Sequence, residues 1–171
     1  MFYIIRRYDK DYVRDDMRNA LAEYLFEVDK WRYYEVVLFG NSMMTLTTDM
    51  LKMVTLELVK SPVLTVEVRK NTQLRIQLLY NVALTMIEKK ELEFAKELIK
   101  ETWKSIEKDE TLVLERIKLH YLEGYHMYKC REDEAGRKLM KEAIETFNTY
   151  KCMHLASNFE DHYEKNVKKS L

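Results

Sequence analysis

The stretch 71–102, NTQLRIQLLYNVALTMIEKKELEFAKELIKET, decides the fold. It is typical of a helix, a polar break and a second helix, because apolar residues recur at helical spacing on both sides of the charged run 88–91. The first helix is apolar on two sides, so it must lie between neighbours. Its two stripes are Ile76, Leu79, Tyr80, Ala83 and Ile87, and Leu74, Leu78, Val82 and Thr85; the second helix carries Leu92, Ala95, Leu98, Ile99 and Trp103.

The composition limits the class of protein. The 171 residues are 47% hydrophobic and 34% charged, which is typical of a globular domain with a real core. The chain has only 3 Gly and 1 Pro, and this scarcity of turn-forming residues favours long helices joined by short polar links. The 29 basic and 29 acidic residues balance, which gives no electrostatic footprint for nucleic acid. No apolar run suits a membrane span and the start lacks the core of a signal peptide, so we expect a cytoplasmic protein.

Capping residues and apolar spacing predict the order of the helices. Residues 1–8 are typical of the tail of a helix, Asp11 and Asp29 are predicted N-caps, and Ser61 with Pro62 should stop a helix that begins at Thr48 or Asp49. The helix after Asp11 is expected to bury Val13, Met17, Leu21, Tyr24, Leu25 and Val28. The predicted helices cover residues 11–28, 31–46, 48–60, 66–88, 92–108, 111–128, 135–150 and 153–168, the last with a polar outer face suited to an end cap.

Small residues indicate an internal repeat of the tetratricopeptide type. That pattern places a small residue on one helix, a second twelve positions on, and a third seven further on, where two helices cross closely. The residues that fit are Gly124, Gly136 and Ala143, and also Ala83, Ala95 and Thr102. The two sets are 41 positions apart, which is longer than the usual period of about 34 and indicates lengthened helices.

Two amides stand out as candidate binding residues. Asn41 and Asn81 each lie on a predicted apolar helix face, and burying an unpaired amide costs a few kcal/mol. An Asn side chain can pair with both the C=O and the N–H of an extended peptide backbone, and helical solenoids offer a concave surface for such a ligand. Alternatively, each Asn bonds a neighbouring helix or a trapped water.

Three further residues have a binding and a structural interpretation. Arg75 is one turn before Leu79, where its planar guanidinium would anchor a ligand carboxylate; the alternative is a solvated surface Arg. Tyr121 and Tyr125 share one stripe with Tyr128 and would line a pocket for apolar side chains. More often such a stripe belongs to the core, with its hydroxyls at the rim.

The sequence gives no support to a metal or catalytic site. Cys130 and Cys152 should end successive antiparallel helices, with Cα atoms about 30 Å apart, so we expect free thiols. The spacing from Glu123 to His126 suits a di-iron bundle, but such a site needs the motif twice. HExxH, CxxC, Walker and GxSxG motifs are absent from the sequence, and we predict neither an enzyme nor a cofactor.

Three groups of residues resemble landmarks of the Rgg/GadR/MutR family of Gram-positive transcriptional regulators. In 25–43, LFEVDKWRYYEVVLFGNSM, a Trp is followed by Tyr-Glu and Leu-Phe-x-Asn, which here end at Asn41. The second group is Leu79-Tyr80-Asn81, followed by Ile87-Glu88 and the run 93–99. The third group comprises Leu122, Glu123, Gly124, Gly136, Met140, Ala143, Ile144 and Phe147. The order and spacing of these groups cover nearly the whole chain.

The resemblance implies a helical-repeat domain that dimerises and binds a short secreted and re-imported pheromone peptide in a concave groove. Family members place polar residues facing that groove where Asn41 and Asn81 stand here. The family also carries an N-terminal helix-turn-helix DNA-binding domain, which we expect to be absent, since the chain opens within the repeat region. We therefore expect either an excised regulatory domain or a truncated relative that has lost its DNA-binding domain.

Together, the repeat and the resemblance predict a single all-α domain over residues 1–171. It should comprise about eight helices in antiparallel pairs, wound as a tetratricopeptide-like right-handed superhelix with a C-terminal capping helix. The leading hypothesis is a homodimeric sensor that binds a short hydrophobic peptide through Asn41, Asn81, Arg75, Tyr121 and Tyr125. DNA would be reached only through a domain outside these residues. The alternatives are a protein–protein interaction scaffold without a peptide ligand, and a helical metalloenzyme.

Overall fold

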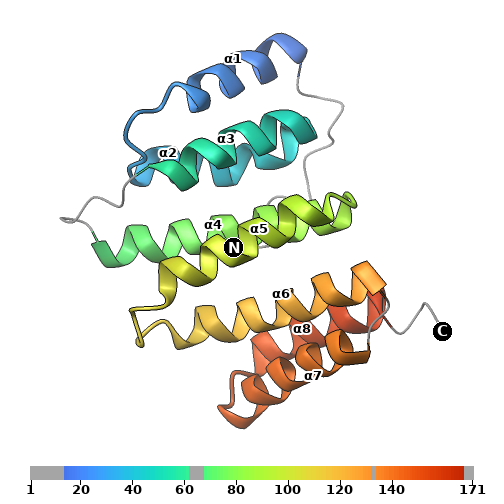
Figure 1. Ribbon diagram of the computed structural model, residues 1–171. Coiled ribbons are helices and arrows are strands. Elements are labelled where there is room, and N and C mark those ends of the chain that lie inside the picture. Colours follow the sequence, from blue (N-terminus) through green and yellow to red (C-terminus); the bar gives the residue numbers. More distant parts are fainter. Residues whose placement is uncertain (1–13, 62–67, 132–133, 168–171) are drawn as a thin grey trace. The chain divides into compact units, whose positions relative to one another are not determined.

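The computed structural model describes residues 14–61, 68–131 and 134–167 (Figure 1). Within these ranges the chain forms α-helices, one short 3-10 helix and no strand, which confirms the all-α prediction of about eight helices. The predictions for residues 1–8, Asp11, Val13, Pro62 and 66–67, and for the end of the last helix at 168, lie outside the described residues. The elements are α1 Asp15–Phe26, α2 Tyr33–Ser42, η3 Met43–Thr45, α3 Thr48–Lys60, α4 Val68–Glu88, α5 Leu92–Ile106, α6 Val113–Arg131, α7 Glu134–Thr149 and α8 Met153–Asn166.

The chain divides into two compact units between Val82 and Ala83, within α4. The first unit holds α1 to α3 with the first part of α4. The second unit holds the rest of α4 with α5 to α8.

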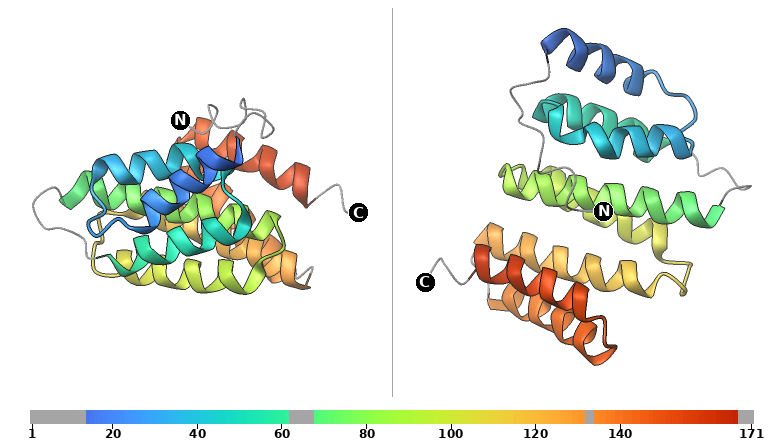
Figure 2. Two further views of the ribbon diagram at one scale, coloured as in Figure 1. Left: turned by 90° about the horizontal axis from the view of Figure 1, so that it is seen from above. Right: turned by 180° about the vertical axis from the view of Figure 1, so that it is seen from behind.

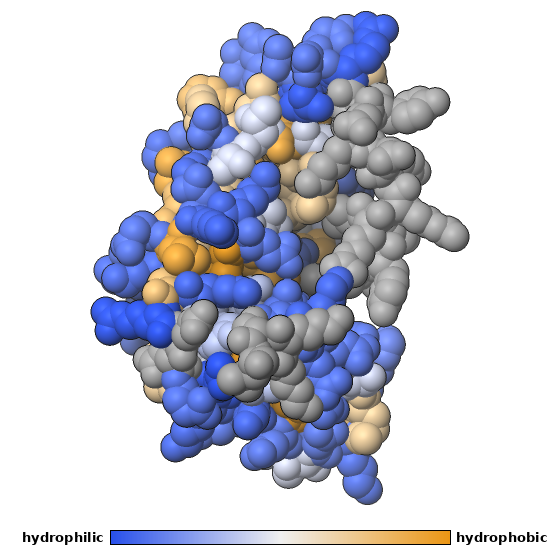
Figure 3. Space-filling view, turned by 90° about the vertical axis from the view of Figure 1, so that its right-hand side faces the viewer, coloured by the Kyte–Doolittle hydropathy of each residue, from blue (hydrophilic) through white to orange (hydrophobic). Residues whose placement is uncertain are grey.

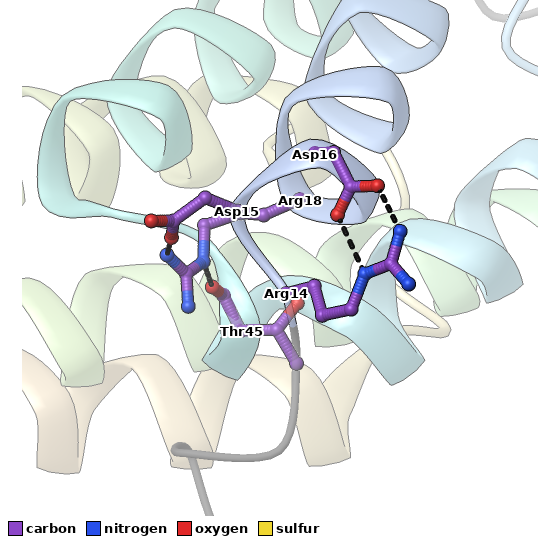
Figure 4. A network of polar contacts seen from close by, with 5 residues as sticks. All are labelled: Arg14, Asp15, Asp16, Arg18 and Thr45. Carbon is purple, nitrogen blue, oxygen red and sulfur yellow. Dashed lines mark hydrogen bonds and ion pairs between the residues drawn. The ribbon is translucent and has the colours of Figure 1, made fainter.

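In the first unit, α1 packs against α3 and is also held at the end of η3. Arg18 donates from Nε to the carbonyl oxygen of Thr45 at 2.7 Å and forms an ion pair with Asp15 (Figure 4). Arg14 and Asp16 form a second, exposed pair beside it, with Nε 3.0 Å from Oδ1. Because the second pair is exposed, it adds little stability, whereas the Arg18 contact joins two elements.

The predicted inner face of α1 is wrong in two places. Met17 and Tyr24 point to solvent with 60% and 47% of their surfaces exposed, while Leu25 is fully buried. Leu21 and Val28 are half-buried. Apolar spacing predicted a broad buried stripe, but Leu25 is the one buried side chain among the described residues of α1.

The helices α2 and α3 supply most of the core of the first unit. The buried apolar side chains are Val36, Phe39, Met43 and Leu46 of α2 and its continuation, and Leu51, Val54 and Leu58 of α3. The predicted cap at Asp29 is wrong, because α2 begins at Tyr33, where the N–H of Arg32 donates to Glu35 Oε2 at 3.0 Å. Trp31 instead turns inward, with its ring 5.7 Å from that of Phe39.

In the second unit, α6 and α7 cross at two glycines. A Cβ on Gly124 would lie 2.7 Å from the Gly136 carbonyl oxygen and 2.8 Å from Leu139 Cβ, and one on Gly136 would lie 2.5 Å from the Gly124 carbonyl oxygen. Only glycine permits this approach. The predicted close crossing at these residues is confirmed, and the other small residues, Ala143, Ala83, Ala95 and Thr102, are buried. The helix α7 also packs on α8 (Figure 2, right).

Two helix-ending turns of the second unit have the same geometry. The N–H of Glu91 donates to the Met86 carbonyl at 2.8 Å, and that of Cys152 donates to the Phe147 carbonyl at 2.8 Å. The residues before them, Lys90 and Lys151, have φ of 64° and 58°. This is the Schellman ending of a helix, which normally has glycine at the left-handed position. The chain makes two sharp reversals here with lysine.

Candidate functional site

The two candidate amides belong to the first unit and flank a contact between α2 and α4. A Cβ on Gly40 would lie 3.8 Å from Leu78 Cδ1, so the helices touch at this point. Asn41 follows Gly40 directly, and Asn81 is one helical turn after Leu78. Asn81 is half-buried, but Asn41 is exposed, which contradicts its expected place on a buried face.

Asn81 forms an amide pair with Gln77. The Gln77 Nε2 atom donates to Asn81 Oδ1 at 3.1 Å across one turn of α4. This bond fixes which end of the Asn81 amide faces Gln77. Gln77 is absent from the residues singled out in the sequence, although its spacing of four from Asn81 is the signal that would have revealed it.

The outer face of α2 next to Asn41 is mixed in character. Tyr34, two turns earlier, is 63% exposed, and Leu38 is half-buried between them. On the side of the molecule drawn in Figure 3, the described residues are mostly hydrophilic, with some hydrophobic ones between them. An amide beside partly exposed apolar side chains can hydrogen-bond a peptide backbone while its neighbours contact side chains.

Arg75 is engaged with the end of α3. Its Nη1 and Nη2 atoms donate to the carbonyl oxygens of Ser61 at 2.8 Å and Val59 at 3.0 Å. Burial lowers the pKa of this guanidinium. Carbonyls at a helix end carry partial negative charge and lack partners within the helix, so the guanidinium caps α3. Neither of the two interpretations of Arg75 anticipated this contact.

Tyr121 and Tyr125 lie in the core of the second unit. The Tyr121 hydroxyl oxygen is 3.2 Å from the Phe159 carbonyl oxygen and 2.8 Å from His162 Nδ1. The Tyr125 ring meets His162 edge-on at 4.7 Å, and burial raises its pKa to about 12. Both side chains are buried, so contact with a ligand would require the packing of α6 and α8 to open.

The structure distributes the candidate residues over both units. Asn41 and Asn81 flank one contact between helices, and Arg75 caps α3 in the same unit. The tyrosines belong to the second unit.

His126 contacts the Leu92 carbonyl oxygen through Nε2 at 2.9 Å. In the part of the chain that the structure describes, no three His, Cys, Asp or Glu side chains gather as metal ligands. None of the described helices has the length and hydropathy that crossing a membrane requires.

Comparison with known proteins places the chain in a family. The family model described as "HTH-type transcriptional regulator Rgg, C-terminal domain" matches residues 3–161. The crystal structure of the SHP pheromone receptor Rgg2 from Streptococcus dysgalactiae is similar at 27% identity and a TM-score of 0.82, covering 90% of this chain and 57% of that one. A variant of the same receptor with one cysteine replaced by serine gives the same identity and TM-score.

Two more distant structures share the fold. A putative transcriptional regulator from Listeria monocytogenes EGD-e has 18% identity and a TM-score of 0.79, with 92% of this chain and 54% of that chain covered. Regulator of Proteinase B, RopB, complexed with SIP has 21% identity and a TM-score of 0.51, with 94% and 71% covered. The chain thus spans little more than half the length of the Rgg2 receptor. The match over residues 3–161 shows that the chain belongs to the family of C-terminal domains of HTH-type Rgg transcriptional regulators.

Proposed function

We propose that this domain senses a short hydrophobic peptide and acts as a homodimer. The peptide would lie extended along a groove, with its backbone paired to the Asn41 and Asn81 amides. Binding would shift a conformational equilibrium that is passed to a DNA-binding domain outside these residues. A regulator of this kind works in the cytoplasm, where a re-imported peptide meets it.

The similarity to the Rgg2 receptor carries the proposal. That protein is described as a receptor for the SHP pheromone, and over the matched part it has 27% sequence identity to this chain and a similar fold. The family is one of transcriptional regulators and not a class of enzymes, so a binding function is the natural one to transfer.

The position of the amides supports the same function. Both flank the α2–α4 contact at Gly40 and Leu78, so one extended strand could reach both helices. Asn81 is held by Gln77 in one orientation, which lowers the entropy lost on binding. Beside Asn41, the partly exposed Tyr34 and Leu38 would accept apolar side chains of the peptide.

We assign different roles to the other three candidates. Arg75 holds the end of α3, and Tyr121 and Tyr125 fill the core of the second unit, so we propose that they support the domain and contact no ligand directly. Asn41 and Asn81 are therefore left as the proposed contacts.

A thermal-shift screen tests the proposal. The probes are a pool of synthetic hydrophobic peptides, including the SHP pheromone named for the streptococcal receptor, with polar sequences of the same length as controls. A ligand at a hundred times its Kd adds about 2.7 kcal/mol to the free energy of unfolding, so Tm should rise for hydrophobic peptides only. An unchanged Tm with every peptide, or equal shifts with the polar controls, would contradict it.

The dimer is tested separately by light scattering on the eluting protein. A mass of about twice 20.8 kDa at micromolar concentration is the expected result. A monomer that persists at high concentration, with and without a bound peptide, would remove dimerisation from the proposal and leave peptide binding intact.

A further inference from the structure

We propose that an exposed row of side chains on α3 is the surface through which two copies of this chain meet, with their α3 helices antiparallel across a two-fold axis. The row consists of Asp49, Met53, Leu56 and Lys60 in the first unit, and we call it the outer row of α3. The inference rests on the homodimer proposed above and names the residues that form its contact.

The outer row lies opposite the face of α3 that enters the core. Its four residues follow one another at intervals of four, three and four, so they share one side of the helix. Met53 and Leu56 have 49% and 46% of their surfaces exposed. The opposite side carries the buried residues Leu51, Val54, Thr55 and Leu58. The helix α3 thus has apolar side chains on both its buried and its exposed side.

The exposed sides of α5 and α7 are different. The exposed residues of α5 are Glu93, Lys96, Glu97, Lys100, Lys104 and Ser105, all of them polar. Those of α7 are polar except Ala135. A helix that faces water on one side normally keeps that side polar. Two large apolar side chains one turn apart on α3 therefore indicate a surface that a partner covers.

The order of residues along the outer row fits a second copy of the same row. When two antiparallel helices are related by a two-fold axis, residues at equal distances from the axis and on opposite sides of it face each other. With the axis midway between Met53 and Leu56, Met53 of one copy faces Leu56 of the other, and Asp49 faces Lys60. The contact then has four apolar side chains in the middle and opposite charges at both ends, as expected for an interface with an apolar centre and a polar rim.

Asp49 and Lys60 suit these end contacts. Asp49 is exposed in the first turn of α3, and Lys60 is in the last turn with 67% of its side chain exposed. Lys60 Nζ is 2.7 Å from Glu57 Oε1 in the same helix. Because such an exposed pair is weak, the ammonium can also meet a carboxylate of the other copy. The antiparallel arrangement also places the positive end of each helix dipole beside the negative end of the other.

The size of this surface predicts a reversible dimer. With 13 residues, α3 is about 20 Å long. A single pair of helices of this length covers less than the roughly 800 Å² per partner of a standard interface. We therefore expect the dimer to dissociate on dilution.

Sedimentation velocity over a range of protein concentrations tests the surface. The double variant Met53→Ser with Leu56→Ser should raise the Kd of the dimer about tenfold or more. The control is Met153→Ser, which removes an exposed methionine at the start of α8 in the second unit and should leave the Kd unchanged. An unchanged Kd in the double variant, or an equal rise in the control, would overturn the inference and leave the homodimer standing. A wild-type chain that stays monomeric at every concentration would overturn both.

An exchange of the end charges tests the antiparallel pairing. Asp49→Lys and Lys60→Asp each bring like charges together at both ends of the contact, so each should raise the Kd about tenfold at low salt. Combining the two substitutions restores opposite charges and should bring the Kd back towards the wild-type value. Both substitutions oppose the dipole of α3, so a loss caused by the helix alone would grow in the combined variant. A combined variant that dimerises no better than the single ones overturns the antiparallel contact.

Discussion

Arg75 and Arg116 are 41 residues apart, and each donates hydrogen bonds to carbonyls at the end of a helix in its own unit. Arg75 donates to the last carbonyls of α3, and Arg116 donates from Nη2 to the carbonyl oxygens of Ile106 at 2.7 Å and Glu107 at 3.0 Å, at the end of α5. The interval equals that between Ala83 and Gly124. Both copies of the repeat thus contain an arginine whose guanidinium caps the end of the preceding α-helix of the pair, α3 for Arg75 and α5 for Arg116.

Replacing either arginine should weaken the fold. Arg75→Ala and Arg116→Ala each remove two charge-assisted hydrogen bonds to a helix end, so we expect the free energy of unfolding to fall by about 1–3 kcal/mol. The measurement is the urea midpoint at an unchanged m-value. Arg116→Lys should restore part of the loss, since it keeps the charge but not the planar fork. A shift of the urea midpoint below experimental error in both alanine variants would contradict a stabilising role for the two arginine caps.

The glycine crossing gives the sharpest packing test. Gly124→Ala and Gly136→Ala place a methyl group within 2.8 Å of backbone or Cβ atoms, so we expect a loss of about 2–4 kcal/mol despite the better helix propensity of alanine. Gly40→Ala is the control, because its Cβ would meet only Leu78 Cδ1 at 3.8 Å and the propensity gain of up to about 1 kcal/mol should prevail. In thermal unfolding, the Tm of Gly40→Ala should lie above that of the wild type, and the Tm values of Gly124→Ala and Gly136→Ala far below it. Equal changes of Tm in all three variants would show that helix propensity, and not packing, sets the stability.

Most of the helix order and the Gly124–Gly136 crossing could be predicted, because apolar period and small-residue spacing are local signals. The face of α1 could not. Met17 and Tyr24 have the right spacing for a buried stripe, but burial depends on whether a second helix covers that side, and spacing carries no such information. The cap of α2 was missed for a similar reason, since Asp29 is a good capping residue that the turn around Trp31 leaves outside the helix.

Lys90 and Lys151 have left-handed backbone angles, and we expect this to lower the free energy of unfolding. A side chain at φ near 60° costs of order 1 kcal/mol, which glycine avoids. Lys90→Gly and Lys151→Gly should therefore each stabilise the protein by about 0.5–1 kcal/mol. Lys96→Gly, on the exposed face of α5, should cost about 1 kcal/mol and serves as the control. Destabilisation by all three glycines in urea titrations would show that these turns carry no strain.

High pH should unfold the domain through its buried tyrosines. Burial raises the pKa of Tyr125 to about 12 and also raises that of Tyr80. The unfolded chain loses these protons near pH 10 while the folded chain keeps them, so stability is fully present below pH 10 and falls as the pH rises towards 12. The slope is at most about 1.4 kcal/mol per pH unit for each tyrosine. Tyr125→Phe should flatten the dependence of the urea midpoint on pH; an unchanged slope would exclude Tyr125 as its source.

The candidate site was predictable in residue type but not in environment. Asn41 and Asn81 were found because an amide interrupts an apolar pattern. The pattern could not show that Asn41 is exposed, or that Arg75 is engaged by carbonyls of α3, since such partners lie in another helix. Gln77 was overlooked although its spacing of four from Asn81 was visible in the sequence, because a glutamine on a helix surface is ordinary.

The central claim, that a peptide backbone binds at these amides, is tested most directly by calorimetric titration of a hydrophobic peptide that raises Tm. Asn81→Ala should weaken its binding by about 1–3 kcal/mol, while the exposed Asn148→Ala in α7 leaves the affinity unchanged and both variants keep the wild-type circular dichroism spectrum. Wild-type affinity in the folded Asn81→Ala protein would contradict the account.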